Sequence, residues 1–307
     1  FERMLSQFEH ADTFGSLIVP YEQDLEGIGE MLDKKKVGED ALYYNTHKHV
    51  LKLINQADYL SSKYQVVVTN PPYLGTSGFG KEKEDWFRSN YPNSRSDFFA
   101  MFIERCLSLS VKQGFIAMIN MQSWMFLSSY EKLRKHLVKN YEFITMAHLG
   151  PRAFDSIGGE VVSTTSFALQ NTKPDNKQGA YVRLVEGKSE EEKRKLYLEA
   201  LANPDCGWFF RCKTSDFNKI PGAPIAYWVG EVLVSAFNKK YSIGDCLETR
   251  EGLTTGNNDK YLRLWYECPQ NSIGYGINST EDSVRSLKKW FPYVKGGEYR
   301  RWYGNND

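Results

Sequence analysis

The residues best suited to chemistry follow a short apolar run. Asn70-Pro71-Pro72-Tyr73 comes directly after the β-branched stretch 63–69. An aromatic amine such as N6 of adenine is a poor nucleophile, because its lone pair is delocalised into the ring. Two acceptors, the side-chain oxygen of Asn70 and the backbone carbonyl of Pro71, can hold its two N–H groups and turn the lone pair towards an electrophile.

The prolines and the tyrosine fit this interpretation. Proline restricts φ to about −65°, so the Pro71 carbonyl is held in place with little reorganisation when a base arrives. The ring of Tyr73 can stack on the face of that base. The alternative interpretation is a simple turn after a core strand, because Asn and Pro favour turns and Pro cannot continue a central ladder.

An alternation of strands and helices must position these residues. The pattern predicts a buried parallel strand over 63–69 that ends at Asn70. It also predicts a helix over 96–111 and a basic amphipathic helix that opens with capping-box spacing from Ser128 to Glu131. Further strands are predicted at 114–121, 141–150 and 160–171. This order is expected of the second half of a doubly wound α/β sheet, whose ligands lie beyond the carboxyl ends of the strands.

The composition of the chain changes after residue 185. The charged segment 186–220, with capping-box spacing from Ser189 to Glu192, predicts a helical, solvated connector. Residues 221–307 are rich in Gly, Asn, Tyr and Trp and contain short strand-like pieces. They predict a second domain.

Overall composition narrows the possible functions. The 307 residues carry a net charge of +1, so binding to a polyanion requires a local basic patch. The five cysteines form no Cys-x-x-Cys pair, which disfavours a metal site or a disulfide framework and favours a reducing, cytoplasmic location. The pattern indicates neither a signal peptide nor a membrane span. Because the chain starts and stops inside patterned sequence, we expect a fragment of a longer protein.

The motif and its surroundings resemble a known enzyme family. Residues 69–73 resemble motif IV of N6-adenine DNA methyltransferases, although similar loops occur in enzymes that methylate glutamine side chains or RNA amines. Segments such as SRSDFFAMFIERC and HLGPRAFDSIGGEVVSTTSFAL are similar to restriction-modification adenine methyltransferases, most of all to the PglX family of phage-growth-limitation and BREX defence systems. The resemblance covers most of residues 1–265. It implies the second half of a class I S-adenosylmethionine-dependent methyltransferase sheet, followed by the start of a mixed α+β target recognition domain.

The resemblance implies a set of substrate residues. Asn70, Pro71, Pro72 and Tyr73 would form the loop that grips and stacks an adenine flipped out of double-stranded DNA. The segment EVVSTTSFAL matches motif VIII, whose strand supplies a second ring against the base. Phe167 is the candidate for that ring, although an ungapped alignment places the position at Leu169.

The resemblance also implies S-adenosylmethionine as the methyl donor, bound beside Asn70. Asp97 and Phe98 match motif V, at the start of a helix that borders the cofactor pocket. A helix-terminal acid and a core aromatic residue are equally expected there. The glycine-rich loop and following acidic residue of the family have no match in residues 1–65. The first domain, 1–185, is therefore expected to hold only part of the cofactor site, and the isolated fragment to be inactive.

Basic residues near the end of the chain suggest the DNA contact. Lys295, Arg300 and Arg301 are interleaved with aromatic residues in a segment that resembles the specificity domains of these enzymes. Arg134 lies on a basic helix that is expected to be a solvated face. His148 lies in a predicted strand, where a satisfied core or pocket-edge residue is expected rather than a general base.

Two classes of function stay open. The first is an enzyme that methylates adenine in double-stranded DNA, within a restriction-modification or phage-defence system. The second is a non-catalytic component that recognises DNA or other defence proteins. Methylation of protein glutamine or of RNA is a third possibility, disfavoured by the long second domain.

Overall fold

The chain forms two compact units, residues 1–240 and 241–307. The structure is a computed structural model, and it describes residues 2–21, 25–34, 41–155, 162–237, 239, 243–247 and 255–293. Within these ranges no helix is long and apolar enough to cross a membrane.

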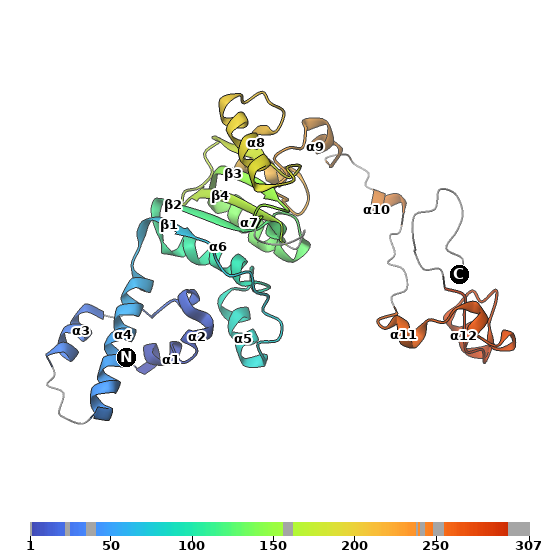
Figure 1. Ribbon diagram of the computed structural model, residues 1–307, viewed down its shortest axis with the longest axis horizontal. Coiled ribbons are helices and arrows are strands. Elements are labelled where there is room, and N and C mark those ends of the chain that lie inside the picture. Colours follow the sequence, from blue (N-terminus) through green and yellow to red (C-terminus); the bar gives the residue numbers. More distant parts are fainter. Residues whose placement is uncertain are drawn as a thin grey trace. The chain divides into compact units, whose positions relative to one another are not determined.

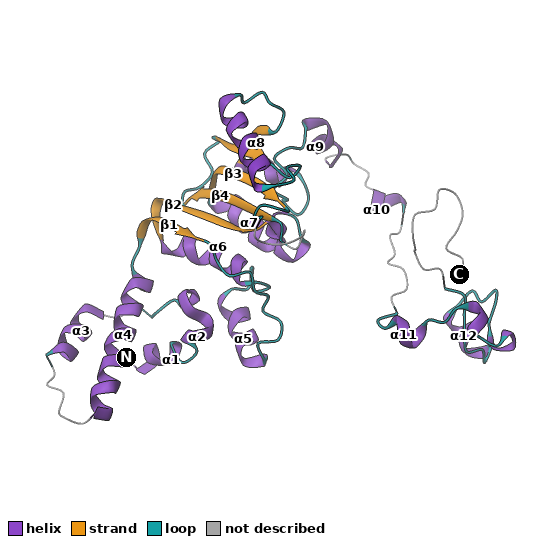
Figure 2. Ribbon diagram, viewed as in Figure 1, coloured by secondary structure: helices purple, strands orange, loops and turns teal. Residues whose placement is uncertain are grey.

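A six-stranded mixed sheet forms the centre of the first unit (Figures 1 and 2). Its strands are β1 Tyr64–Thr69, β2 Ser110–Met121, β3 Glu142–Gly150, β4 Thr164–Gln170, β5 Gln178–Arg183 and β6 Phe209–Lys213. Their spatial order is β1-β2-β4-β3-β5-β6, with β4 and β6 antiparallel to their neighbours. The carboxyl ends of β1, β2, β3 and β5 therefore share one edge of the sheet. The predicted α/β class is confirmed.

One face of the sheet is covered by two helices, α6 Phe98–Leu109 and α7 Glu131–Asn140 (Figure 1). Alternate residues of the strands point into this layer, as the two-residue period of a strand requires. The buried apolar strand residues there are Ile116, Met118, Phe143, Met146, Phe167, Leu169 and Tyr181. The capping box expected from Ser128 to Glu131 does not form, because a 3-10 turn over Ser128–Tyr130 precedes α7.

The amino-terminal helices form a second core of their own. They are α1 Glu2–Gln7, α2 Ala11–Phe14, α3 Leu25–Asp33, α4 Ala41–Ser61 and α5 Lys81–Asn90. Arg105 of α6 joins this core to the sheet, because its guanidinium donates to the carbonyls of Ser16, Ile18 and Leu60 at 2.7 to 2.9 Å. The end of α4, and with it the start of β1, is thereby held against α6.

The predicted connector is part of the first unit. Helix α8 Glu190–Ala202 begins at the expected N-cap, where the Ser189 hydroxyl accepts from the Glu192 amide at 3.2 Å. It packs on the face of the sheet opposite α6 and α7 (Figure 1). Strand β6 pairs with β5. The division of the chain lies near residue 240 rather than 220, because Ile225 and Tyr227 are buried in the core between the sheet and its helices.

The second unit has little regular structure in its described part. Short helices α10 Ile243–Cys246, α11 Asn258–Tyr261 and α12 Thr280–Arg285 occur, together with an isolated bridge between Ile273 and Trp290. Within residues 255–293 the structure shows no longer strand. Helix α9 Glu231–Phe237 precedes this unit and is exposed along its length.

Strand β1 is less buried than the sequence predicts. It lies at the edge of the described sheet, and Val66 and Val68 are 59% and 71% exposed. Both share a face with Phe115 of β2, which is 41% exposed, while Val67 points into the covered face. The expectation of a fully buried strand is therefore wrong for this chain, since helices cover only one face of β1 and β2.

A matched pair of substitutions tests this asymmetry. Val67→Thr should lower the free energy of unfolding of this chain by about 1 to 2 kcal/mol, because it places a hydroxyl against the apolar core. Val68→Thr has the same change of atoms on the open face and should cost less than about 0.5 kcal/mol. Urea denaturation of both variants measures the difference. Equal losses of unfolding free energy in the two variants would contradict the conclusion that Val68 lies on an uncovered face of the sheet.

Candidate active site

The Asn-Pro-Pro-Tyr loop lies at the carboxyl edge of the sheet, directly after β1. Asn70 and Pro72 are exposed, Pro71 is buried and Tyr73 is half-buried. Gly114 of β2 allows the two strands to approach closely, because a Cβ at this position would lie 2.9 Å from the Gln65 carbonyl. The loop is thus presented to solvent on a strand that is itself firmly paired.

Tyr73 holds the functional amide of the loop. Its hydroxyl lies 3.3 Å from Asn70 Oδ1 and 3.4 Å from the Ile119 carbonyl at the end of β2, so one proton is shared between two acceptors. Burial raises the pKa of Tyr73 further above neutrality, so its hydroxyl is a hydrogen-bond donor at neutral pH. Because an amide oxygen has two lone pairs, Asn70 Oδ1 can accept from Tyr73 and still accept from a bound amine.

The Pro71 carbonyl is the second expected acceptor. In the described part of the chain no hydrogen bond ends at this oxygen. Pro71 is buried and Pro72 follows it, so the peptide plane that carries the oxygen has little freedom. The two acceptors that the sequence predicts are therefore adjacent at the end of β1.

The two motif V residues have different surroundings. Asp97 is the N-cap of α6, and its Oδ1 accepts from the amides of Leu74 and Phe99, each at 3.2 Å. Burial raises the pKa of Asp97, although the bonds from Phe99, Leu74 and Phe98 oppose the shift. Asp97 thus lies against the Asn-Pro-Pro-Tyr loop.

Phe98 is a core residue instead. It is 5% exposed, and its ring lies 5.3 Å from that of Phe87 and 5.7 Å from that of Phe79. The expected cofactor contact by Phe98 is not supported, because the first residue of α6 faces α5 and has no open side for a ligand.

Phe167 does not lie where a stacking ring is needed. It is 2% exposed and pairs with Met118 of β2 and Met146 of β3 on the covered face. Its ring lies 5.1 Å from the ring of Trp124. The alternative, Leu169, is 0% exposed on the same face. The prediction that Phe167 or Leu169 stacks on the base is therefore wrong, because the register of β4 directs both side chains into the core.

A polar network occupies the neighbouring end of β3. His148 is 3% exposed and lies 2.7 Å from Gln122 Oε1 through Nε2 and 3.2 Å from the Tyr227 hydroxyl through Nδ1. Since an amide oxygen only accepts, Nε2 carries the proton and Tyr227 donates to Nδ1. Burial, with Arg183 and Lys193 nearby, lowers the pKa of His148 to about 4. The histidine is therefore a neutral, satisfied core residue, as the sequence suggested.

Arg134 is a positioning residue that the sequence missed. Only 2% of it is exposed, and its guanidinium donates to the carbonyls of Trp124, Leu127 and Gly222 at 2.6 to 3.0 Å. The expectation of a solvated face is wrong at this position. Periodicity could not show it, because the carbonyls that Arg134 binds come from a turn and from a segment 88 residues away.

The predicted DNA-contacting residues Lys295, Arg300 and Arg301 lie outside the described residues. The described part of the second unit does contain cations beside aromatic rings. Arg263 and Lys289 lie 5.9 and 5.4 Å from the centre of the Trp290 ring. Such pairs suit contact with bases and phosphates, and they also occur in surface turns.

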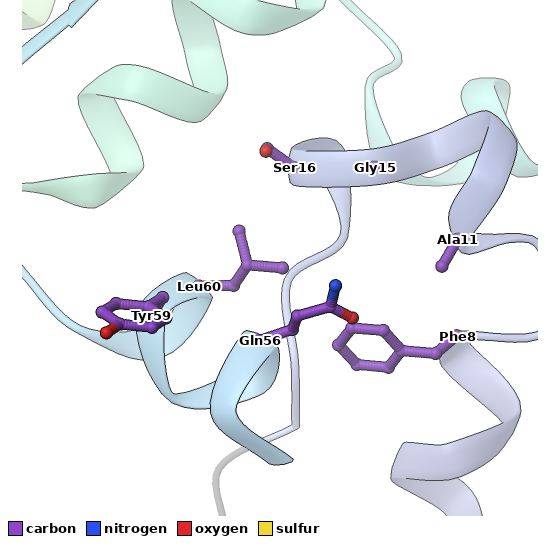
Figure 3. A pocket seen from close by; sticks show the side chains of 7 residues that line it. All are labelled: Phe8, Ala11, Gly15, Ser16, Gln56, Tyr59 and Leu60. Carbon is purple, nitrogen blue, oxygen red and sulfur yellow. The ribbon is translucent and has the colours of Figure 1, made fainter. Parts of the chain in front are cut away.

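A cavity of about 280 Å³ lies between α4 and the amino-terminal helices (Figure 3). It is lined by Phe8, Ala11, Gly15, Ser16, Gln56, Tyr59 and Leu60. None of these belongs to the Asn-Pro-Pro-Tyr loop, and few polar groups converge there. Among the described residues no group of three or more His, Cys, Asp or Glu side chains is placed to hold a metal.

Comparison with known proteins supports the resemblance to adenine methyltransferases that the motif indicated. The sequence profile of the Eco57I restriction-modification methylase family matches residues 13–154. The chain is 39% identical over 310 residues to the adenine-specific methyltransferase PglX of Lacticaseibacillus casei (strain Zhang), across 98% of this chain and 26% of that protein. It is 40% identical over 309 residues to the adenine-specific methyltransferase BrxX of Escherichia coli O9:H4 (strain HS), across 99% and 24%.

The chain thus spans about a quarter of the length of these curated relatives. A solved structure, the methyltransferase subunit of a type I restriction-modification system from Streptococcus thermophilus, aligns with 55% of this chain and 38% of its own at a TM-score of 0.40 and 15% identity. The resemblance inferred from the sequence is confirmed by the two curated relatives and the family profile.

The buried histidine predicts a pH dependence of stability. The pKa of His148 is lower in the folded chain, about 4, than the ordinary 6.5, so the neutral form is favoured by folding. Its contribution is complete above pH 6.5 and is lost as the pH falls towards 4. Between pH 7.5 and 5.0 it should remove about 2 kcal/mol from the free energy of unfolding. Urea denaturation of wild type and His148→Gln at both pH values measures this loss, which should be absent in the variant.

Proposed function

We propose that this chain forms part of a DNA methyltransferase that modifies N6 of an adenine flipped out of double-stranded DNA, with S-adenosylmethionine as the methyl donor. The observation that carries the proposal is the Asn-Pro-Pro-Tyr loop, exposed at the carboxyl end of β1 with Asn70 Oδ1 held by the Tyr73 hydroxyl. Two relatives named adenine-specific methyltransferases, 39% and 40% identical over nearly the whole chain, support it.

The loop acts on the acceptor nitrogen. Asn70 Oδ1 and the Pro71 carbonyl each accept one N–H of the adenine amine, which directs its lone pair away from the ring system. When bound, S-adenosylmethionine supplies an electrophilic methyl group. The nitrogen takes the methyl group as the bond between that group and the donor sulfur breaks, and it then releases one proton to water. A neutral amide therefore suffices, and no enzyme nucleophile is required. Tyr73 supports the base through its half-buried ring.

The described residues supply the acceptor side of the reaction and only part of a donor site. Asn70 does not line the cavity between α4 and the amino-terminal helices. Of the two motif V residues, Phe98 lies in the core and Asp97 Oδ1 is bound by two backbone amides. Edge strand β1 and the open face at Val66 and Val68 favour further strands and helices beyond these residues. We therefore assign residues 1–240 to an incomplete catalytic unit.

The second unit is assigned to target recognition. Its cation and aromatic pairs, at Lys260 with Tyr261 and at Arg263 and Lys289 with Trp290, support contact with DNA, and Lys295, Arg300 and Arg301 extend the basic character. A restriction-modification or phage-defence system is the proposed setting, since the matching profile is that of restriction-modification methylases. Other defence proteins are further candidate partners.

The catalytic role of the loop is tested by Asn70→Ala in the intact protein that contains this chain. Removing one of the two acceptors should lower kcat for methyl transfer at least about 100-fold, the usual cost of losing one such preorganised contact. Transfer of tritiated methyl from S-adenosylmethionine into host-sequence DNA measures it.

The matched control is Asn203→Ala, an exposed asparagine at the end of α8. It should label DNA like wild type. Equal labelling by wild type and Asn70→Ala would contradict the catalytic assignment. If the wild-type protein binds DNA but transfers no label, the non-catalytic recognition function is favoured instead.

The DNA contact is tested by the triple variant Lys295→Ala, Arg300→Ala, Arg301→Ala. Each cation that neutralises a phosphate steepens the plot of log affinity against log salt by about 0.9, so the variant should have a slope shallower by up to roughly 3. Fluorescence anisotropy over a salt series measures it. Lys195→Ala, on the exposed side of α8, is the control and should leave the slope unchanged. An unchanged slope in the triple variant would exclude these residues from the interface.

A further inference from the structure

The Asn-Pro-Pro-Tyr loop has few amides of its own with which to hold itself in place. Pro71 and Pro72 have no N–H group, so two consecutive residues of the loop cannot donate to the backbone. The loop must be tied by side chains or by the residues that follow it. The structure shows such ties directly after Tyr73.

The residues that follow the loop are bound to the segment before α6. The Phe98 amide donates to the Leu74 carbonyl at 3.0 Å, and Gly75 forms a bridge with Asp97. One step further, the Thr76 hydroxyl donates to the Arg95 carbonyl at 2.7 Å and its amide to Ser96 at 3.3 Å. All of these bonds join backbone groups or end on a backbone carbonyl, and none involves the Asn70 side chain.

The Asp97 side chain binds the residue that directly follows the loop. Its Oδ1 accepts from the Leu74 amide, the first amide after Tyr73, and from the Phe99 amide of α6, each at 3.2 Å. The same oxygen therefore caps a twelve-residue helix and fixes the end of the loop. A displacement of Leu74 would be passed to Tyr73, whose hydroxyl orients Asn70.

We propose that Asp97 is a positioning residue that acts on the acceptor nitrogen through the Asn-Pro-Pro-Tyr loop, by holding the Leu74 amide, and that it is not a ligand of the methyl donor. This rests on the proposed methyl transfer. It differs from the cofactor contact that the family resemblance implies for this position, because Asp97 Oδ1 is engaged by two backbone amides, one of which follows the loop directly.

Helix capping and loop anchoring can be separated by the choice of substitution. Asp97→Ser keeps a good N-cap, but its hydroxyl is one atom shorter and should not reach Leu74 while it caps α6. Asp97→Asn keeps an oxygen in the place of Oδ1 and should keep both bonds. Ser189→Ala is the control, because it removes the side-chain cap of α8, far along the chain from the loop.

The kinetic test uses the intact protein and measures kcat, KM and the dissociation constant for S-adenosylmethionine. Asp97→Ser should lower kcat about 10- to 100-fold, the range expected for a misplaced reacting group, with the cofactor affinity unchanged within about twofold. Asp97→Asn should restore kcat to near the wild-type value. Ser189→Ala should leave kcat unchanged although its melting temperature falls.

A second readout does not depend on catalysis. Hydrogen exchange at the Leu74 amide should be slow in wild type and Asp97→Asn and faster in Asp97→Ser, while the amides of α6 keep their protection in all three. A raised dissociation constant for the cofactor with unchanged kcat, or wild-type exchange at Leu74 in Asp97→Ser, would overturn the proposal. Absence of methyl transfer by wild-type protein would overturn the proposed function instead, and the exchange rates would still decide whether Asp97 anchors the loop.

Discussion

The candidate site depends on holding a loop that has two prolines and few amides of its own. A hydroxyl, Tyr73, fixes the loop from inside by binding both Asn70 and the end of β2. A carboxylate, Asp97, fixes it from the far side through Leu74. Because the loop is rigid where it carries its acceptors and is tied at both flanks, its two oxygens can be preorganised before a base arrives. The remaining structure can be understood as support for that arrangement.

Buried cations supply much of the support. Arg105 binds carbonyls at the ends of segments that precede β1, and Arg134 binds the turn that follows β2. Lys193 of α8 donates to the carbonyls of Leu149 and Leu184, at the ends of β3 and β5. Each cation is satisfied by backbone oxygens, which is what allows a charge to be buried. Connections around the carboxyl ends of the strands are thereby fixed to helices that pack on the sheet.

The covering of the sheet is uneven in a way that agrees with the extent of the chain. Helices α6 and α7 cover one face, and α8 covers the other face only at β3, β5 and β6. Val66, Val68 and Phe115 are left open beside the edge of β1. Sheets with parallel strands are ordinarily buried on both faces. We propose that a further part of the polypeptide packs on this open surface, since the chain spans about a quarter of the length of its relatives.

The sequence by itself determined the strands of the first half, the α6 helix and the place of the Asn-Pro-Pro-Tyr loop, because periodicity, N-caps and proline act over a few residues. It also indicated the Ser189 cap and the satisfied state of His148. Only the tertiary structure decided which faces are covered, and so buried Phe98, Phe167 and Arg134 and exposed Val68. Burial depends on which distant elements meet, and β6 and the partners of Asp97 and Arg134 likewise arise from contacts between segments far apart in the chain.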